Sequence, residues 1–401
     1  MNTIDWATLD PAAPLDDLEP LRDLVAGARV VAVGEAAHHV REFYLFRHRM
    51  LRFLVERCGF TVYGLEAPYA EGRLIDAWVQ GGAGTVEDAA ARGVDHGMGD
   101  CQEMYDTLAW LREHNRAAER PVRFAGCLAG STRGSLEEVV AYLREADPDA
   151  LPMAERAHRL AGGGREVTTM KLITDHARLA PEVQDELTAL ISRLVVRMET
   201  MAGHQNRQGR AREHAEVLHH LRNAWYHDHS ARDFNGRGLA VGSACIEAAG
   251  AATVMRLLEN GERVVLAAHN THIRKTAIDH DGDFGLFPQG YLLAQELGEE
   301  YVSIAATSVG GRTAAGRLAP EHPDGYVARD TVLPPLTADC VETAFGVGAA
   351  LSVADLRGTD PGRYRRIRML DHFMDLPVAE AYDAVACVPE TRTVAGFEEE
   401  N

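Results

Sequence analysis

This chain of 401 residues is 46% hydrophobic and 25% charged, a composition typical of a globular protein with a substantial core. Acidic residues outnumber Lys and Arg by 60 to 41, and the net charge of -19 argues against nucleic acid as a partner, because a negative surface repels phosphate. No apolar run approaches the roughly 18 residues of a membrane span, so we expect no membrane association. The six cysteines include no C-x-x-C pair, and the N-terminus carries no basic, apolar export signal, which predicts free thiols in the cytoplasm.

The first part of the chain predicts a parallel strand–helix–strand unit. Residues 30–33 form an apolar, β-branched run that ends at Gly34, as expected of a buried strand. Apolar residues then recur at helical spacing over 41–57, and Gly59 is suited to end that helix. Residues 61–65 predict the next strand, so we expect a right-handed crossover between parallel strands.

The rest of the chain continues this alternation apart from one long helical segment. From 147 to 228 there is no strand pattern, and helical stretches are interrupted by glycines and Pro181, which predicts an all-helical insertion. Further strands are expected at 122–125, 263–268, 301–307 and 384–388, and further helices at 103–115, 135–145, 248–258, 290–297 and 377–382. We therefore predict an α/β fold with a largely parallel central sheet, flanked by helices on both faces.

The predicted organisation has three segments. Residues 1–146 form the first part of the α/β core, residues 147–230 form the helical insertion that roofs a cleft, and residues 231–401 form the second part of the core. Both parts of the core are expected to contribute side chains to the cleft.

Polar side chains follow three of the predicted strands at the point where each strand ends. They are Glu35 and His38 after the first strand, Glu66 after the second, and His269, Asn270 and His272 after the fourth. In an open α/β sheet, ligands bind outside the carboxyl ends of the strands. A single histidine after a strand is more often structural, but burying carboxylates and imidazoles together is costly unless they pair. We therefore predict that these side chains form a functional site.

The predicted site favours general base catalysis by a histidine. A neutral imidazole is a competent base when a carboxylate fixes its tautomer and stabilises the imidazolium. The sequence closest to a G-x-S-x-G serine elbow is 129–133, in which the first glycine is out of register. Water activated directly by a histidine is therefore the simplest hydrolytic scheme.

A metal site is the main competing prediction. His269 and His272, together with Glu35, His38 and Glu66, include the ligand types of zinc or manganese. However, H-x-x-H at a strand end is a poor ligand pair unless the chain turns sharply, and the sequence contains no H-E-x-x-H. We therefore predict no metal and no other cofactor, and we keep a metal-dependent hydrolase as an alternative.

Several separated motifs resemble the erythromycin esterase family. They are Gly34-Glu35-Ala36-Ala37-His38, Glu42-Phe43, Arg47, Glu66, Trp110 to Asn115, Arg232-Asp233, Ala268-His269-Asn270-Thr271-His272 and Gly290 to Tyr301. Motifs that occur in order over about residues 28–312 are more specific than one short pattern. The resemblance implies hydrolysis of the lactone ester of macrolide antibiotics, a small-molecule substrate, by histidine-activated water without a required metal.

The resemblance also implies a role for each matching residue. His38 corresponds to the general base, Glu66 to the carboxylate that positions it, and Glu35 to a second acid. Arg47 corresponds to a buried cation that holds these carboxylates ionised. A purely structural pairing of Arg47 is an equally good interpretation, and of the consecutive residues 47–49 at least one should face solvent on a helix.

The second histidine motif is expected to bind substrate. His269, Asn270 and His272 correspond to residues that line the cleft, where the histidines orient substrate or donate to a developing oxyanion. Two departures from the family bear on macrolide specificity. Residues 126–128 lack the Asp that usually follows the third strand, and the Gly-rich residues 234–242 replace a usual Met-Ala-x-Asn segment.

Two other functions fit parts of this pattern. A dry cleft would activate a substrate hydroxyl in place of water, which gives acyl transfer or ring closure in natural-product biosynthesis. A non-catalytic binding protein with this fold would be expected to lack catalytic residues, yet all of the matching residues are present.

Overall fold

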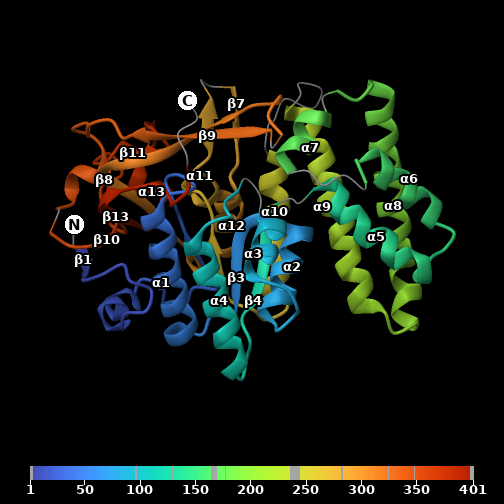
Figure 1. Ribbon diagram of the computed structural model, residues 1–401, viewed down its shortest axis with the longest axis horizontal. Helices are drawn as coiled ribbons and strands as arrows, with labels where there is room; N and C mark the ends of the chain where they lie inside the picture. The colour runs from blue at the N-terminus through green and yellow to red at the C-terminus, as the bar shows by residue number, and fades with distance from the viewer. Residues whose placement is uncertain are drawn as a thin grey trace.

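The computed structural model describes residues 3–94, 97–128, 131–163, 169–176, 178–234, 244–280, 283–323, 325–346 and 348–397. A mixed sheet forms its centre, and six neighbouring strands of this sheet run parallel (Figure 1). In order across the sheet they are β13 (Ala384–Thr391), β8 (Tyr301–Leu318), β2 (Val30–Val33), β5 (Val264–Ala267), β3 (Val62–Pro68) and β4 (Arg123–Leu128). The predicted parallel sheet is confirmed.

Two strands that the sequence did not predict extend one edge of the sheet. β10 (Leu351–Asp355) pairs antiparallel with β13, and β1 (Thr3–Trp6) pairs antiparallel with β10. They are five and four residues long, too short for a clear alternating pattern.

Helices cover both faces of the sheet. Along β2, Val31 and Val33 point into one hydrophobic cluster, whereas Val30 and Ala32 point into another. The first cluster is covered by α1 (Arg41–Cys58), α2 (Tyr69–Val79), α3 (Val86–Gly93) and α4 (Gln102–Ala117), and the second by α10 (Ala244–Glu259), α11 (Asn270–Ile273), α12 (Gln289–Leu297) and α13 (Val378–Ala381). Because the central strands lie between two helix layers, they are apolar on both sides.

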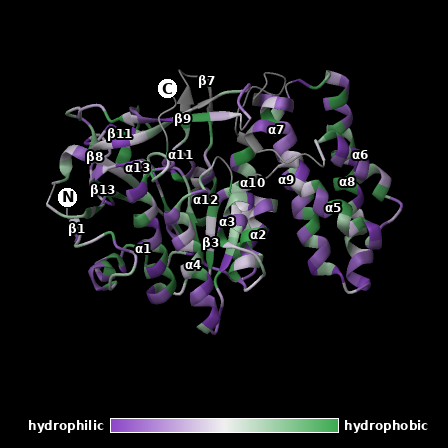
Figure 2. Cartoon of the chain, viewed as in Figure 1, coloured by the Kyte–Doolittle hydropathy of each residue, from purple (hydrophilic) through white to green (hydrophobic). Residues whose placement is uncertain are grey.

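A group of helices with its own hydrophobic cluster stands beside the sheet (Figure 1). It consists of α5 (Thr132–Ala146), α6 (Leu151–Leu160), α8 (Pro181–Arg207) and α9 (Ala211–Phe234), and α7 (Thr169–His176) packs against α9. Figure 2 shows hydrophobic and hydrophilic residues on different sides of these helices. The predicted absence of strands between 147 and 228 holds for the described residues. Helix α5 also packs in this cluster, although it precedes the predicted boundary at 147, and the domain boundaries stay a prediction.

Helix α1 is buried on the side where the sequence predicted solvent. Arg47, His48 and Arg49 are 4%, 5% and 0% exposed, so the prediction that one of them faces solvent is wrong. The reason is that the N-terminal segment covers the outer side of α1. The Arg49 guanidinium donates to the Pro14 carbonyl at 2.7 Å and to Asp17 Oδ1 at 2.8 Å, which compensates for its burial.

Strand β8 continues past the sheet and forms a hairpin with β9 (Tyr326–Val332), visible across the top of Figure 1. The tip of this β8–β9 hairpin reaches α7. Lys171 Nζ donates to the Pro320 carbonyl at 3.0 Å, and Arg178 Nη2 donates to Glu321 Oε1 at 2.8 Å. The hairpin therefore links the second part of the core to the group of helices.

The remaining described elements are short. They are η1 (Asp16–Leu21), β6 (Ile278–His280), β7 (Asp283–Leu286), η2 (Gly298–Glu300), η3 (Val341–Ala344), β11 (Arg366–Met369) and β12 (His372–Asp375), of which β6–β7 and β11–β12 are antiparallel hairpins. Within the described residues, no helix combines the length and the apolar character needed to cross a membrane. The prediction of free thiols is confirmed for all six cysteines.

The end of β2 lies unusually close to the segment that follows β5. The Asn270 side chain donates to the Ala306 carbonyl at 2.8 Å and accepts from the Ala306 N–H at 3.1 Å, and the Asn270 N–H donates to the Glu35 carbonyl at 2.8 Å. A Cβ atom on Gly34 would lie 2.1 Å from Asn270 Oδ1. Glycine at this position therefore allows Asn270 to join the ends of β2, β5 and β8.

We predict that Gly34→Ala destabilises the protein by about 1–3 kcal/mol, because the added methyl group forces Asn270 away from β8. The free energy of unfolding measured by denaturant titration tests this. Gly310→Ala is the matched control, since a Cβ atom there meets no heavy atom within 4 Å. Equal stability of the two variants would contradict the close approach.

Candidate active site

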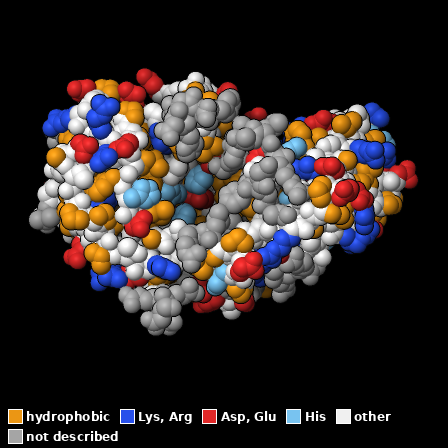
Figure 3. Space-filling view, turned by 90° about the horizontal axis from the view of Figure 1, so that it is seen from above, with side chains coloured by type: hydrophobic (Ala, Val, Ile, Leu, Met, Phe, Trp, Pro, Cys, Tyr) orange, Lys and Arg blue, Asp and Glu red, His pale blue; other side chains and the backbone are white. Residues whose placement is uncertain are grey.

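The predicted strand-end residues converge because β5 lies between β2 and β3 in the sheet. The three carboxyl ends are therefore adjacent, and the polar side chains that follow them meet at one place. Figure 3 shows histidine and acidic side chains gathered in a hollow of the surface seen from above.

Glu35 is the innermost acid of this site and is 1% exposed. Its Oε1 atom lies 2.9 Å from His38 Nδ1 and 2.9 Å from Arg47 Nη1, the latter reaching in from α1. Burial alone would raise the pKa of the Glu35 carboxyl, but the Arg47 guanidinium and the hydrogen bond from His38 outweigh it and lower the pKa. Glu35 is therefore an ionised acceptor for both neighbours.

Glu66 is held by histidines and not by Arg47. Its Oε2 atom accepts from the His269 backbone N–H at 2.6 Å, and its Oε1 atom lies 3.0 Å from His272 Nε2 and 3.8 Å from His38 Nε2. Burial would raise the pKa of Glu66, yet the charges of His272 and His38 leave the pKa well below its ordinary value. The prediction that Arg47 holds both carboxylates is thus wrong for Glu66, because the guanidinium is paired with Glu35.

His38 stands between the two carboxylates and its side chain is 19% exposed. Its Nδ1 atom faces Glu35, and its Nε2 atom faces Glu66 across a gap that is too long for a hydrogen bond. Burial would lower the pKa of His38, but Glu66 and Glu35 outweigh it and raise the pKa above the ordinary value. The ring is thus oriented by Glu35, with the other nitrogen available on the side of Glu66.

The three residues predicted to bind substrate all have partners within the protein. Asn270 is 0% exposed and both of its polar side-chain atoms bind the backbone of β8, so its predicted contact with substrate is wrong. His269 Nε2 donates to the Ala36 carbonyl at 2.9 Å, and its Nδ1 accepts from the Thr271 hydroxyl at 2.6 Å. Burial and the charge of His38 lower the pKa of His269 to about 4. His269 is therefore a neutral ring that joins the ends of β5 and β2, with no N–H left to donate to an oxyanion.

His272 bridges two carboxylates, one of which the sequence did not predict. Its Nε2 atom lies 3.0 Å from Glu66 Oε1, and its Nδ1 atom lies 2.6 Å from Oε1 of Glu247 on α10. Burial would lower the pKa of His272, but the two carboxylates raise it well above the ordinary value. Because both ring nitrogens are engaged, the predicted donation from His272 to an oxyanion is not supported by the geometry.

Glu247 was missed because it lies on a helix and not at a strand end. A signal does exist in the sequence, since Glu247 is the only charged residue between Ala244 and Met255. Its Oε2 atom accepts from the Gln289 N–H, the first of α12, at 2.7 Å. A lone acid in an apolar helical stretch therefore indicated a buried partner.

Acidic and basic groups alternate along the whole site. The order is Arg47, Glu35, His38, Glu66, His272, Glu247 and the N-terminus of α12.

No group of three or more His, Cys, Asp and Glu side chains with the arrangement of a metal site occurs in the part of the chain that the structure describes. Two segments discussed in the sequence analysis lie outside the described residues. They are 235–243, which include most of the Gly-rich stretch, and 129–130, the start of the sequence compared with a serine elbow.

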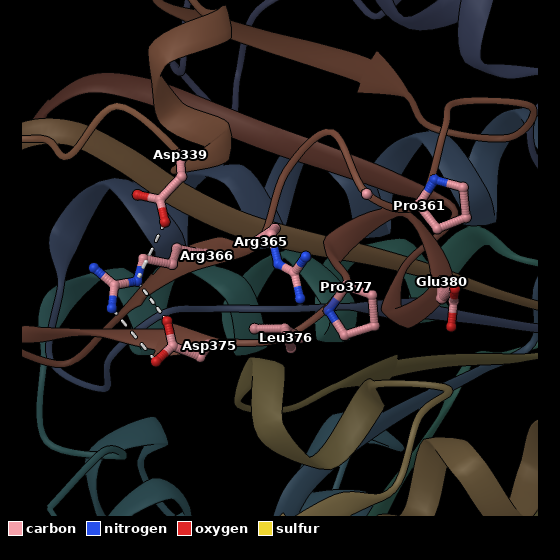
Figure 4. Close-up of a pocket in the computed structure, with 9 residues that line it drawn as sticks. Asp339, Pro361, Arg365, Arg366, Asp375, Leu376, Pro377 and Glu380 are labelled. Atoms are coloured by element: carbon pink, nitrogen blue, oxygen red, sulfur yellow. Dashed lines mark hydrogen bonds and ion pairs between the residues drawn. The ribbon is translucent and has the colours of Figure 1, made fainter.

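A separate pocket of about 560 Å³ lies near β11, β12 and α13 (Figure 4). Its lining comprises Asp339, Pro361, Gly362, Arg365, Arg366, Asp375, Leu376, Pro377 and Glu380. Arg366 pairs with Asp375 and with Asp339, so its charge is already neutralised. The predicted site residues are not among those that line it.

Comparison with known proteins places this chain in a family. The chain matches the family model described as Erythromycin esterase over residues 55–391. The chain belongs to the erythromycin esterase family. Glu66, His269 and His272 fall within the matched part, whereas Glu35, His38 and Arg47 precede it. Membership of the family supports a hydrolase that acts on esters.

Two relatives are similar to this chain in sequence, and two solved structures are similar to it in fold. The chain is 33% identical to erythromycin esterase type II of Escherichia coli over 322 residues, which is 78% of this chain and 76% of that protein. It is 23% identical to erythromycin esterase type I of Escherichia coli, over 93% of each. A mutant of an erythromycin esterase in its open conformation has the same fold, with a TM-score of 0.85, 22% identity and coverage of 99% of this chain and 100% of that chain. A succinoglycan biosynthesis protein follows with a TM-score of 0.78, 19% identity and coverage of 98% and 95%.

We predict that the contribution of His272 to stability is lost at high pH. Its raised pKa means that the paired imidazolium stabilises the fold below the unfolded value of about 6.5, and that this stabilisation disappears as pH rises through the folded pKa. The difference in unfolding free energy between the wild type and His272→Asn should therefore shrink with rising pH. His372→Asn is the control, because the His372 side chain is 56% exposed. A difference for His272→Asn that stays constant with pH would contradict the paired imidazolium.

Proposed function

We propose that this chain hydrolyses an ester or lactone bond of a small molecule with water that is deprotonated by His38. One observation carries the proposal. His38 Nδ1 is bound to Glu35, while Nε2 faces Glu66 across 3.8 Å, and the side chain is 19% exposed. This arrangement fixes the tautomer that leaves the Nε2 lone pair free to accept a proton.

A water molecule beside the 3.8 Å gap that separates His38 Nε2 from Glu66 Oε1 is in reach of both atoms and can donate to both. Each atom is an acceptor when His38 is neutral, so the two protons of the water are used and an oxygen lone pair is left for the substrate carbonyl. As His38 removes one proton, the resulting imidazolium lies between two carboxylates that stabilise it. Arg47 keeps Glu35 ionised throughout.

The proton is then returned to the leaving group. Attack by hydroxide forms a tetrahedral intermediate, and collapse of this intermediate breaks the bond between the carbonyl carbon and the alkoxide oxygen. The imidazolium of His38 donates its proton to that oxygen, which releases a carboxylic acid and an alcohol and restores the neutral base. The acid and base roles thus need only one histidine.

A macrolide lactone is the substrate that we propose first. The relatives named as erythromycin esterases support this class, since the chain covers 76% and 93% of their lengths. The residues that replace the family's usual segments, 126–128 and 234–242, are where we expect specificity to differ. Acyl transfer to a substrate hydroxyl and metal-dependent hydrolysis use the same site and are separated by experiment.

We predict that the purified protein adds one water to members of a panel of macrolides and simple esters, as measured by mass spectrometry. His38→Ala should lower turnover on the order of a hundredfold or more, because the base is lost. His372→Ala, at an exposed histidine, is the matched control.

Other outcomes would contradict the proposed mechanism or indicate a different reaction. Turnover of His38→Ala at the wild-type rate would remove His38 from the mechanism. An unchanged product mass with altered retention would indicate ring closure, and a gain of an acyl group would indicate transfer. Loss of activity with a chelator, restored by zinc, would favour the metal-dependent alternative.

We also predict that kcat/KM falls as pH decreases through a midpoint above about 6.5, because only neutral His38 accepts a proton and its pKa is raised. In Glu35→Gln the midpoint should move to lower pH, since the carboxylate that stabilises the imidazolium is gone and Arg47 remains. The measurement is a pH profile of kcat/KM for both proteins. A shift to higher pH would show that Glu35 does not act on His38.

A further inference from the structure

Glu247 is a buried acid whose two oxygens have separate partners. It is 2% exposed, its Oε1 lies 2.6 Å from His272 Nδ1, and its Oε2 accepts from the Gln289 N–H at 2.7 Å. The second partner is the first residue of α12, where the helix dipole favours a negative charge. Each carboxylate oxygen thus has a partner at hydrogen-bond distance, which offsets the cost of burying the side chain.

The consequence for His272 follows from the chemistry of its neighbours. Nδ1 faces Glu247 and Nε2 faces Glu66, and an ionised carboxylate only accepts hydrogen bonds. Both nitrogens must therefore carry protons, so the ring is an imidazolium. A neutral ring would leave one nitrogen lone pair against a carboxylate oxygen at hydrogen-bond distance.

The positive charge of His272 also affects His38, which lies on the other side of Glu66. His38 lies 2.9 Å from Glu35 and 3.8 Å from Glu66, and two full negative charges at these distances would hold it protonated. Arg47 offsets Glu35, and His272 offsets Glu66, each at 3.0 Å or less. The neutral ring of His269, 5.4 Å from His38, and the phenol of Tyr326 from β9, which faces Glu66, add no charge.

We propose that Glu247 is a positioning residue of this site: with the first N–H of α12 it holds His272 doubly protonated, and His272 offsets the charge of Glu66 so that His38 can release its proton at the working pH. This inference rests on the proposed function, because the charge of Glu66 matters to turnover only if His38 is the base. Glu247 acts through His272, which separates it from the reacting atoms.

The test compares Glu247→Gln with Glu247→Asp in the full chain. In Glu247→Gln the amide donates to His272 Nδ1, so the ring becomes neutral. The net charge of this pair stays zero, but the cation that lies 3.0 Å from Glu66 is lost, and the attraction of Glu66 for a protonated His38 increases. The low-pH limb of kcat/KM should then move to higher pH, with a loss on the order of tenfold to a hundredfold at neutral pH and little change in KM. Glu247→Asp keeps the negative charge, so the low-pH limb of its kcat/KM profile should lie at the same pH as that of the wild type.

Glu342→Gln is the matched control. Glu342 is also a fully buried glutamate that accepts from a backbone N–H, that of Arg368, but its side-chain partner is the Thr307 hydroxyl and not a histidine. The proposal would be overturned if the low-pH limb of kcat/KM stayed in place in Glu247→Gln. It would also be overturned if this limb moved as far in Glu342→Gln as in Glu247→Gln.

A second measurement does not depend on turnover. Nitrogen NMR of labelled imidazoles should show His272 doubly protonated in the wild type at about pH 8, above the ordinary histidine pKa, and neutral in Glu247→Gln. A neutral His272 in the wild type would overturn the inference even if the variant fails to fold. Because no substrate is needed, a doubly protonated His272 in a protein that hydrolyses no ester would refute the proposed function and leave the charge arrangement standing.

Discussion

The structure of this site depends on how its buried carboxylates are compensated. Glu35, Glu66 and Glu247 are removed from water, and each would be costly there without a partner. Arg47 binds Glu35, and His272 binds both Glu66 and Glu247, so each carboxylate has a positive group on at least one side. Each carboxylate thereby has a positive partner without exposure to solvent, and His38 is the ring that has one nitrogen on an acid and the other across a longer gap.

The order of strands in the sheet provides this arrangement. β5 lies between β2 and β3, so the segment after β5 contacts both neighbours. The His269 N–H binds Glu66, its ring binds the loop after β2, and the Asn270 side chain binds β8. These residues hold the loops that carry the acids, which explains why a histidine and an asparagine are present where no contact with substrate is needed.

Much of this site could be predicted from the sequence, because strand ends are visible as apolar runs that stop at polar residues. Glu35, His38, Glu66 and His272 were found in this way. The rule does not distinguish a side chain that lines a cleft from one that joins strands, and it therefore failed for Asn270. Pairing between distant elements is also invisible to it, which is why Glu247 was missed and Arg47 was expected to serve two carboxylates.

The fold shows the same limit. Runs that are buried on both sides identified the six parallel strands, whereas β1 and β10 are too short to show a period. The prediction that one of residues 47–49 faces solvent was wrong because the N-terminal segment covers α1. Local pattern thus specified the elements, and contacts between distant segments decided which faces are buried.

The β8–β9 hairpin has a consequence for how such proteins diverge. Tyr326, at the start of β9, is near enough to Glu66 for the carboxylate to add to the effect of burial in raising the pKa of the phenol. In the turn that precedes Tyr326, Pro320 and Glu321 accept hydrogen bonds from Lys171 of α7 and from Arg178, which follows α7. A change in the length of this turn would therefore move Tyr326 relative to Glu66 without replacing any of the paired acids and histidines, so the surroundings of the site can vary while its charged residues stay the same.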